Sequence, residues 1–287
     1  MSLTWQSPNP PNLPPIRPSG HARATLRAIL VTMLLLAGTL VTLLLRLVEH
    51  AFFASRRRLS SWFVHRVWRA TLRLIGLTHH VEGTQAVPSG SAWQAIVANH
   101  VSWLDIIALG AAQPVVFVSK SDVARWPVIG PLARMVGTVF ITRNPRDAAA
   151  QQHQLSAALS KGHVLAFFPE GTSTDGLRVL PFKSTLMSAF YAHGTPQEAV
   201  IQPVSVIYWA PDTQNERQSE ARFYGWWGDM ALAPHLWRVL AQAPQGMVLV
   251  RRHTPVHARD FTDRKALSQV LEQAVRDGMP PDRRACG

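Results

Sequence analysis

From about residue 93 to residue 276, short apolar runs alternate with segments in which apolar positions recur at a helical period. Continuous apolar runs of this length, bounded by glycine, proline or polar turns, are typical of strands covered on both faces. The predicted strands are 93–98, 115–118, 138–141, 164–168, 200–208 and 247–250, and the predicted helices are 103–109, 146–160, 184–192, 232–240 and 264–276. This alternation predicts an α/β fold with a mixed, largely parallel sheet covered by helices. Pro203 inside an apolar run predicts an edge strand or a bend at that point.

The N-terminal pattern is different, because residues 28–45 form eighteen consecutive uncharged positions flanked by Arg23, Arg27 and Arg46. As a helix this run would be about 27 Å long, close to the roughly 30 Å hydrocarbon core of a bilayer. The run is long for a secretory signal, and residues 51–54 lack the small-residue spacing of a cleavage site. We therefore expect a hydrophobic membrane-anchoring helix that is retained.

A second helical pattern follows at residues 59–75, with apolar and basic positions on different faces. The apolar positions are Leu59, Phe63, Val67, Ala70 and Leu74, and the basic ones are Arg66, Arg69 and Arg73. The pattern fits a basic amphipathic helix at the level of the lipid headgroups, and equally an ordinary helix packed on the following domain. The excess of arginine after the anchor predicts that the rest of the chain lies on the cytoplasmic side of the membrane.

These patterns divide the chain into a disordered, proline-rich leader (1–22), the membrane anchor and amphipathic helix (23–78), a main domain (79–278) and a flexible tail (279–287). Hydrophobic residues make up 47% of the chain and charged residues only 16%, with a formal net charge of +12. This balance favours an anionic bilayer over nucleic acid as the partner. The single cysteine, Cys286, excludes an intrachain disulfide.

Candidate chemistry begins directly after the first apolar run of the main domain, at His100, Ser102 and Asp105. If Ser102 caps the next helix, Asp105 lies in its first turn and His100 stays in the loop, free to fold back. A carboxylate on one imidazole nitrogen fixes the tautomer and leaves the other nitrogen as a base. The alternative is a capping box beside an ordinary loop histidine.

Two further groups of polar residues follow predicted strands. The turn after residue 168 contains Glu170, Gly171 and Thr172, whose backbone N–H and hydroxyl groups suit an oxyanion or a phosphate. Lys120 and Arg143 each stand just past a strand, where they could clamp an acidic headgroup. Taken singly, the turn could be merely polar and the two cations merely solvated.

The order of these groups resembles the glycerolipid acyltransferase family, of the bacterial lysophosphatidate acyltransferase type. Four blocks carry the resemblance over roughly residues 80–210: His100-x-x-x-x-Asp105, Gly137-x-x-Phe140-Ile141-x-Arg143, Phe168-Pro169-Glu170-Gly171-Thr172 and the proline block at 201–204. The resemblance implies transfer of a fatty acyl group from an acyl carrier protein or coenzyme A thioester to the hydroxyl of a lysolipid.

The most direct acceptor under this resemblance is 1-acyl-sn-glycerol-3-phosphate, which gives phosphatidic acid. It further implies that His100 and Asp105 are catalytic, and that Lys120, Arg143, Glu170, Gly171 and Thr172 bind the acceptor. It implies no metal and no cofactor besides the thioester co-substrate, no nucleic acid, and a location on the cytoplasmic face of the inner membrane.

One departure from the family pattern bears on the acceptor. Where the third block usually continues with an arginine that helps to bind phosphate, this chain has Ser173. The block, together with the segment at 226–230, is also similar to the branch that acylates lyso-ornithine lipid, which is therefore the alternative acceptor. A non-catalytic basic membrane-binding protein would explain the charge but not the ordered blocks. A serine hydrolase would need a nucleophile elbow that the sequence lacks, and a metalloenzyme would need histidine spacing in a suitable context.

Overall fold

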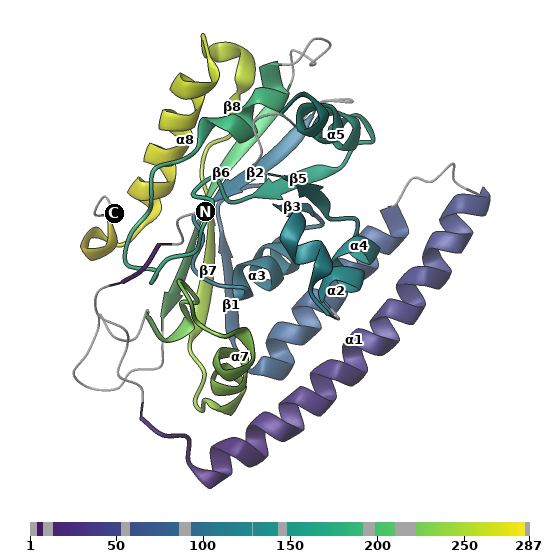
Figure 1. Ribbon diagram of the computed structural model, residues 1–287, viewed down its shortest axis with the longest axis vertical. Coiled ribbons are helices and arrows are strands. Elements are labelled where there is room, and N and C mark those ends of the chain that lie inside the picture. Colours follow the sequence, from purple (N-terminus) through teal and green to yellow (C-terminus); the bar gives the residue numbers. More distant parts are fainter. Residues whose placement is uncertain are drawn as a thin grey trace.

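The sheet predicted from the apolar runs is the centre of the fold (Figure 1). The structure is a computed structural model, and it describes residues 5–7, 14–52, 58–85, 93–127, 129–142, 148–191, 199–209 and 222–284. Eight strands pair among these residues, in the order β1-β7-β6-β2-β5-β3-β4, with β8 beside β6. They are β1 (Thr78–Glu82), β2 (Gln94–Ala98), β3 (Val116–Lys120), β4 (Val139–Ile141), β5 (Val164–Phe167), β6 (Val200–Trp209), β7 (Met247–Arg252) and β8 (Val256–His257).

The five strands from β6 to β4 run parallel to one another, while β7 and β8 pair antiparallel with β6 and β1 runs parallel to β7. The predicted mixed, largely parallel sheet is confirmed. Strands β1 and β8, which are short and mostly polar, were not predicted. The carboxyl ends of β2, β5, β3 and β4 all meet at one edge of the sheet, where loops of α/β proteins gather their functional groups.

Helices cover both faces of the sheet (Figure 1). They are α1 (Pro18–Phe52), α2 (Arg58–Ile75), α3 (Leu104–Ala112), α4 (Ile129–Val136), α5 (Ala148–Ser160), α7 (Leu232–Ala241) and α8 (Arg264–Gly278), with 3-10 helices at Ser121–Arg125, Ser184–Tyr191, Ala258–Asp260 and Pro281–Arg283. One core joins α2, α3 and α7 to one face of the sheet, and the other joins α5, α8 and Ser184–Tyr191 to the opposite face. The predicted helix at 184–192 is thus a 3-10 helix, and α4 was not predicted.

Helix α1 is long and apolar enough to cross a membrane, and it is the one such helix in the described ranges. It lies along α2 and reaches α7, rather than standing away from the domain (Figure 1). Near its end, the buried Glu49 carboxylate accepts hydrogen bonds from the backbone N–H groups of Leu59 and Ser60 and from the Ser60 hydroxyl. Because a buried carboxylate is stable only when its oxygens are paired, these bonds fix the start of α2 against α1.

Helix α2 lies between α1 and α3, so it packs on the domain as the second of the two interpretations requires. Val67 contacts Gly38 of α1, and Trp68 contacts Gly110 of α3. The predicted apolar face is only partly correct, because Leu59 is 47% exposed while Leu72 is almost fully buried. A helix that packs between two other helices buries two sides of its surface. A prediction that assumes one apolar face therefore misses part of the buried surface.

Two further expectations are corrected by the structure. Pro203 lies in β6, a central buried strand, and not at an edge. Its missing N–H is tolerated because the antiparallel partner of β6 changes there from β7, which pairs with Val204, to β8, which pairs with Ile201. Within residues 279–284, expected in a flexible tail, Met279 and Arg283 are buried, and Arg283 donates a hydrogen bond to the Tyr208 carbonyl.

Candidate active site

His100 and Asp105 meet at the carboxyl end of β2. His100 lies two residues past β2, and Asp105 is the second residue of α3. The Nδ1 atom of His100 lies 2.7 Å from Oδ2 of Asp105, so the predicted contact is present. The local mechanism differs from the expected serine cap, since the Ser102 hydroxyl is buried without a partner among the described residues. Instead, Oδ2 of Asp105 accepts from the backbone N–H groups of Val101 and Ser102, at 2.7 and 2.9 Å.

Asp105 is fully buried and accepts four hydrogen bonds. The fourth comes from Tyr208 of β6, whose hydroxyl lies 2.7 Å from Oδ1. Burial, and then the neighbouring Asp105, raise the pKa of Tyr208 well above its usual value, so the phenol remains a donor. Four donors compensate the burial of an ionised carboxylate and fix its plane. Tyr208 was missed by sequence reasoning, because nothing local marks a strand tyrosine as the partner of a residue 103 positions away.

We expect Tyr208→Phe to lower kcat about tenfold, because one charge-assisted hydrogen bond that orients Asp105 is lost, a bond of roughly 1.5–3 kcal/mol. The measurement is steady-state acyl transfer across a range of pH. A change in stability with an unaltered kcat would show that Tyr208 only supports the core.

The His100 ring is held on its other side by Phe168, the residue after β5. The two rings stack with centroids 4.1 Å apart and planes 12° from parallel. The His100 side chain is 20% exposed, and Nδ1 is occupied by Asp105. Nε2 is therefore the ring atom that is left to accept a proton from a substrate.

The backbone of His100 is tied to the turn that follows β5. Its N–H donates to Oε1 of Glu170 at 3.0 Å, and its carbonyl accepts from the Thr174 N–H at 2.9 Å. Glu170 is 2% exposed, and its carboxyl group holds the backbone of the His100 loop in position. The family resemblance had implied that Glu170 binds the acceptor, and its burial argues against direct contact with a substrate.

Burial raises the pKa of Glu170 well above its usual 4.5, more than its hydrogen bonds lower it. An acid with a raised pKa stabilises the fold fully below its unfolded pKa, and this contribution is lost as pH rises toward the folded value. We therefore expect Glu170→Gln, which keeps an acceptor for His100 N–H, to gain stability relative to wild type as pH rises above about 4.5. Urea unfolding of both proteins at acidic and neutral pH measures this, and a pH-independent difference would contradict it.

Gly171 and Thr172 complete the turn. Gly171 has φ +76°, a conformation that favours glycine, and its N–H donates to the Phe168 carbonyl at 3.1 Å. The expected oxyanion role of this turn therefore does not fall to the Gly171 N–H. Thr172 is half-buried, and the contact from its hydroxyl to the Ser173 carbonyl is long, at 3.5 Å. Gly171 is half-buried as well, and Thr172 is the member of the predicted trio whose side chain is only half-buried.

Lys120 lies on the same edge of the sheet, at the end of β3. Continuing the strand register places it about level with His100, with β5 between the two strands. Two strand spacings put it roughly 10 Å to the side of the histidine. Arg143 follows β4, the next strand, and lies outside the described residues.

Ser173, the departure from the family pattern, links the site to a distant segment. It is buried, and its hydroxyl donates to the Trp226 carbonyl. The Trp226 N–H in turn donates to the carbonyl of Val101 at 2.8 Å, in the loop between β2 and α3. Asp175 is also buried, 3.4 Å from Arg178 and 3.8 Å from Arg222. A side chain in the position of the family's arginine here serves structure, and it adds no positive charge to the site.

A histidine base oriented by a buried carboxylate, at the carboxyl edge of an α/β sheet, defines an enzyme that activates a hydroxyl or similar acceptor. The comparisons with known proteins identify the class further. The family described as Acyltransferase matches residues 79–207. The chain is 46% identical over 275 residues to a lyso-ornithine lipid O-acyltransferase from Rhodobacter capsulatus, covering 96% of both chains. The protein belongs to the acyltransferase family.

Other relatives agree at lower similarity. A 1-acyl-sn-glycerol-3-phosphate acyltransferase from Neisseria gonorrhoeae is 32% identical over 182 residues, covering 63% of this chain and 67% of the relative. The crystal structure of a 1-acyl-sn-glycerophosphate acyltransferase from Thermotoga maritima has a TM-score of 0.53 at 21% identity, covering 88% of this chain and 95% of that one. At this identity the structural likeness supports the fold alone.

Proposed function

We propose that the protein transfers a fatty acyl group to the hydroxyl of lyso-ornithine lipid. The observation that carries the proposal is the similarity to the Rhodobacter capsulatus relative, which spans 96% of the chain. That span includes the segment around Trp226, which hydrogen-bonds to the catalytic loop. A second lyso-ornithine lipid O-acyltransferase, from Brucella abortus, is 36% identical and covers 77% of this chain and 81% of the relative.

The reaction follows from the geometry of the catalytic pair. Nε2 of His100 takes the proton of the acceptor hydroxyl while the hydroxyl oxygen attacks the thioester carbonyl. The new C–O bond forms, the C–S bond breaks, and the imidazolium returns its proton to the departing thiolate. Asp105 holds the imidazole through Nδ1 and stabilises its charged form. The chain has no Gly-x-Ser-x-Gly elbow, so the acyl group passes directly to the acceptor without an acyl-enzyme.

The acceptor headgroup lies, in this proposal, along the edge between His100, Thr172 and Lys120, with Arg143 contributing from beyond β4. Ornithine lipids present one carboxylate together with an ammonium group, whereas glycerol phosphate presents a phosphate of up to two negative charges. A site that lacks the family's third-block arginine has less positive charge, which suits the smaller negative charge. Ser173 in that position therefore supports the ornithine headgroup.

The test is acyl transfer by the purified full-length protein from labelled acyl carrier protein or coenzyme A thioester to two acceptors. We expect product with lyso-ornithine lipid and at least tenfold lower kcat/KM with 1-acyl-sn-glycerol-3-phosphate, and no product with His100→Ala. The second acceptor is the alternative function, favoured by the Neisseria gonorrhoeae relative. Preference for it would overturn the proposed acceptor but keep the chemistry, and transfer to neither would overturn both.

Membrane attachment belongs to the same proposal. Helix α1 exposes a row of large apolar residues, among them Met33 at 61%, Leu36 at 66% and Leu40 at 60%. So large an exposed apolar surface is stable in water only when it is covered, and a lipid acceptor makes the bilayer the natural cover. The arginines that follow support the cytoplasmic side of the inner membrane as the location of the catalytic domain.

A further inference from the structure

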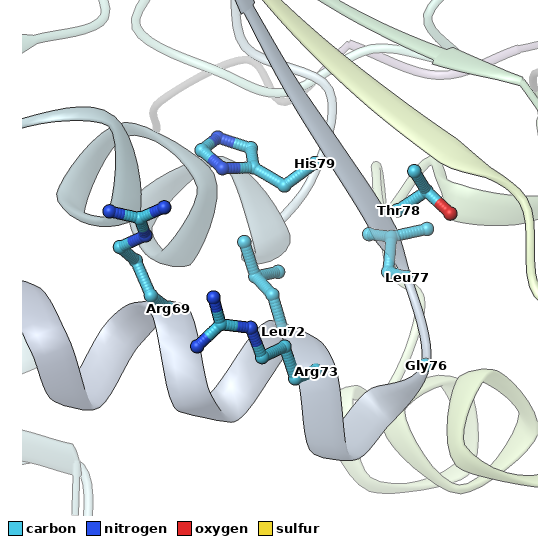
Figure 2. A pocket seen from close by; sticks show the side chains of 7 residues that line it. All are labelled: Arg69, Leu72, Arg73, Gly76, Leu77, Thr78 and His79. Atoms are coloured by element: carbon cyan, nitrogen blue, oxygen red, sulfur yellow. The ribbon is translucent and has the colours of Figure 1, made fainter.

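A cavity of about 310 Å³ lies between the end of α2 and the start of β1, away from the catalytic pair (Figure 2). It is lined by Arg69, Leu72, Arg73, Gly76, Leu77, Thr78 and His79. Its size is at the lower end of the roughly 300–1,000 Å³ found for small-molecule sites. In Figure 2 the side chains of Arg69 and Arg73 extend from α2 into the space below His79.

The two arginines of this cavity have no carboxylate partner among the described residues. Arg69 and Arg73 lie one helical turn apart. Like charges at this spacing on a helix repel each other. An anion between the two guanidinium groups would remove the repulsion and accept hydrogen bonds from both.

His79 adds a neutral polar group to the same wall. Burial, and more weakly the neighbouring Arg69 and His80, lower the pKa of His79 to about 4, so the imidazole is uncharged at neutral pH. Its Nε2 is buried and has no hydrogen-bond partner within the described ranges. A buried polar atom without a partner is costly, which makes a bound ligand or water the expected complement of this wall.

The cavity lies at the same edge of the sheet as the catalytic pair. Thr78 pairs with Met247, which pairs with Trp209 at the carboxyl end of β6. Three strand spacings separate β1 from β2, roughly 14 Å. A lysolipid with its hydroxyl at His100 has its headgroup only a few bonds away, so the headgroup of the acceptor does not reach this cavity.

Helix α1, which carries exposed apolar residues, touches the wall of the cavity. Arg27 of α1 packs against Gly76 at the cavity wall. A Cβ atom added to Gly76 would lie only 2.8 Å from Nη2 of Arg27. The same guanidinium donates to the carbonyls of Leu240 and Gln242, which fixes α1 at this point. Next to Arg27 on α1, Leu26 is 58% exposed and Ile29 is 52% exposed. A free phosphate ion would make no use of this apolar helix, whereas a phospholipid can lay its acyl chains on it.

We propose that this cavity binds the phosphate of an anionic phospholipid of the bilayer, separately from the acceptor. The guanidinium groups of Arg69 and Arg73 hold the phosphate, and the acyl chains lie against the exposed side of α1. Because the cavity and the catalytic pair share one edge of the sheet, the bound lipid holds that edge at the membrane surface, where the acceptor arrives.

The first experiment is flotation of the full-length protein with vesicles of phosphatidylcholine, alone or mixed with phosphatidylglycerol. The variant Arg69→Gln/Arg73→Gln is expected to lose about 30-fold in affinity for the mixed vesicles, the effect of removing two basic groups next to an anionic bilayer. The matched control, Arg264→Gln/Lys265→Gln, removes the same charge from exposed positions on α8, which covers the opposite face of the sheet. Equal losses in both variants, or no loss in the first, would overturn the proposal.

A second experiment needs no variant. Labelled histidine resonances of the wild-type protein are followed by NMR during titration with dihexanoyl phosphatidylglycerol, and separately with inorganic phosphate. The proposal expects the short-chain lipid to shift the His79 resonances and raise the pKa of His79, with phosphate having a weaker effect at higher concentration. His235 is the internal control, since burial also lowers its pKa to about 4 but it lies outside the cavity.

An unchanged His79 would overturn the lipid site, and an equal response to phosphate alone would replace the lipid by a free anion. Turnover of a water-soluble short-chain acceptor by Arg69→Gln/Arg73→Gln is expected to match wild type. This measurement separates a failure of the lipid site from a failure of the proposed acyl transfer.

Discussion

Replacing His100 by alanine is expected to reduce kcat by at least roughly 10²–10⁴, the usual contribution of a general base. Nε2 is the one ring atom placed to accept the acceptor proton, because Nδ1 is held by Asp105. The measurement is acyl transfer from the labelled thioester with saturating lysolipid, for wild type and variant.

The fold should tolerate this change. The His100 side chain is 20% exposed, and the change removes its stack on Phe168, a ring pair of about 0.5–1.5 kcal/mol. It also removes one of the four hydrogen bonds to Asp105, which keeps three donors. His153→Ala, an exposed histidine on α5, is the matched control and should retain full activity. A folded His100→Ala protein with undiminished turnover would remove the catalytic role altogether.

Asp105→Asn is expected to be the second most damaging change, with kcat lower by about 10³–10⁴. The amide has the same shape as the carboxylate, but it puts an NH₂ group in the place of Oδ1 or Oδ2. Both of these oxygens accept hydrogen bonds in the wild-type protein. In either orientation of the amide, its NH₂ group faces a hydrogen-bond donor. If the NH₂ takes the place of Oδ1, the Tyr208 hydroxyl must rotate away. If it takes the place of Oδ2, the ring N–H of His100 and the backbone N–H groups of Val101 and Ser102 lose their acceptor. The imidazole is then free to adopt the tautomer that places its proton on Nε2.

The same substitution should lower the free energy of unfolding by about 1–3 kcal/mol, because at least one buried donor is left without an acceptor. The two effects are measured separately, by urea unfolding and by kcat at a temperature where both proteins are folded. Asp260→Asn, at a carboxylate that is 58% exposed, is the control for the charge change. If the loss of activity followed only the fraction of protein unfolded, Asp105 would be a structural residue and not the partner of the base.

Hydrogen bonds from distant parts of the chain hold His100 and Asp105 in position. The loop between β2 and α3 is held by three segments that are distant in sequence: Glu170 and Thr174 after β5, Tyr208 in β6, and Trp226. Each bond ends on the backbone of the loop or on Asp105, and none ends on Nε2 of His100. The histidine is thereby positioned by its surroundings while its reactive nitrogen is left for the substrate, as preorganised catalysis requires.

Much of this arrangement is determined by the sequence alone. The apolar runs locate β2, β3, β4, β5, β6 and β7, because a strand buried on both faces must be continuously apolar. The meeting of His100 with Asp105 is also local, since five residues that span a strand end, a loop and a helix start leave little freedom. Interactions between residues close in sequence are therefore sufficient to predict these strands and the contact between His100 and Asp105.

The remaining features depend on which strands become neighbours. Tyr208 reaches Asp105 only because β6 lies beside β2, and Phe168 stacks on His100 only because β5 lies on the other side. The same arrangement buries Glu170, which looks accessible in sequence, and places Pro203 in a central strand. Local patterns record how much of a segment is buried and with what period, but the order of strands is chosen by the packing of the whole chain. The sequence determined the elements and the meeting of His100 with Asp105, and the tertiary structure alone decided which distant side chains hold these two residues in place.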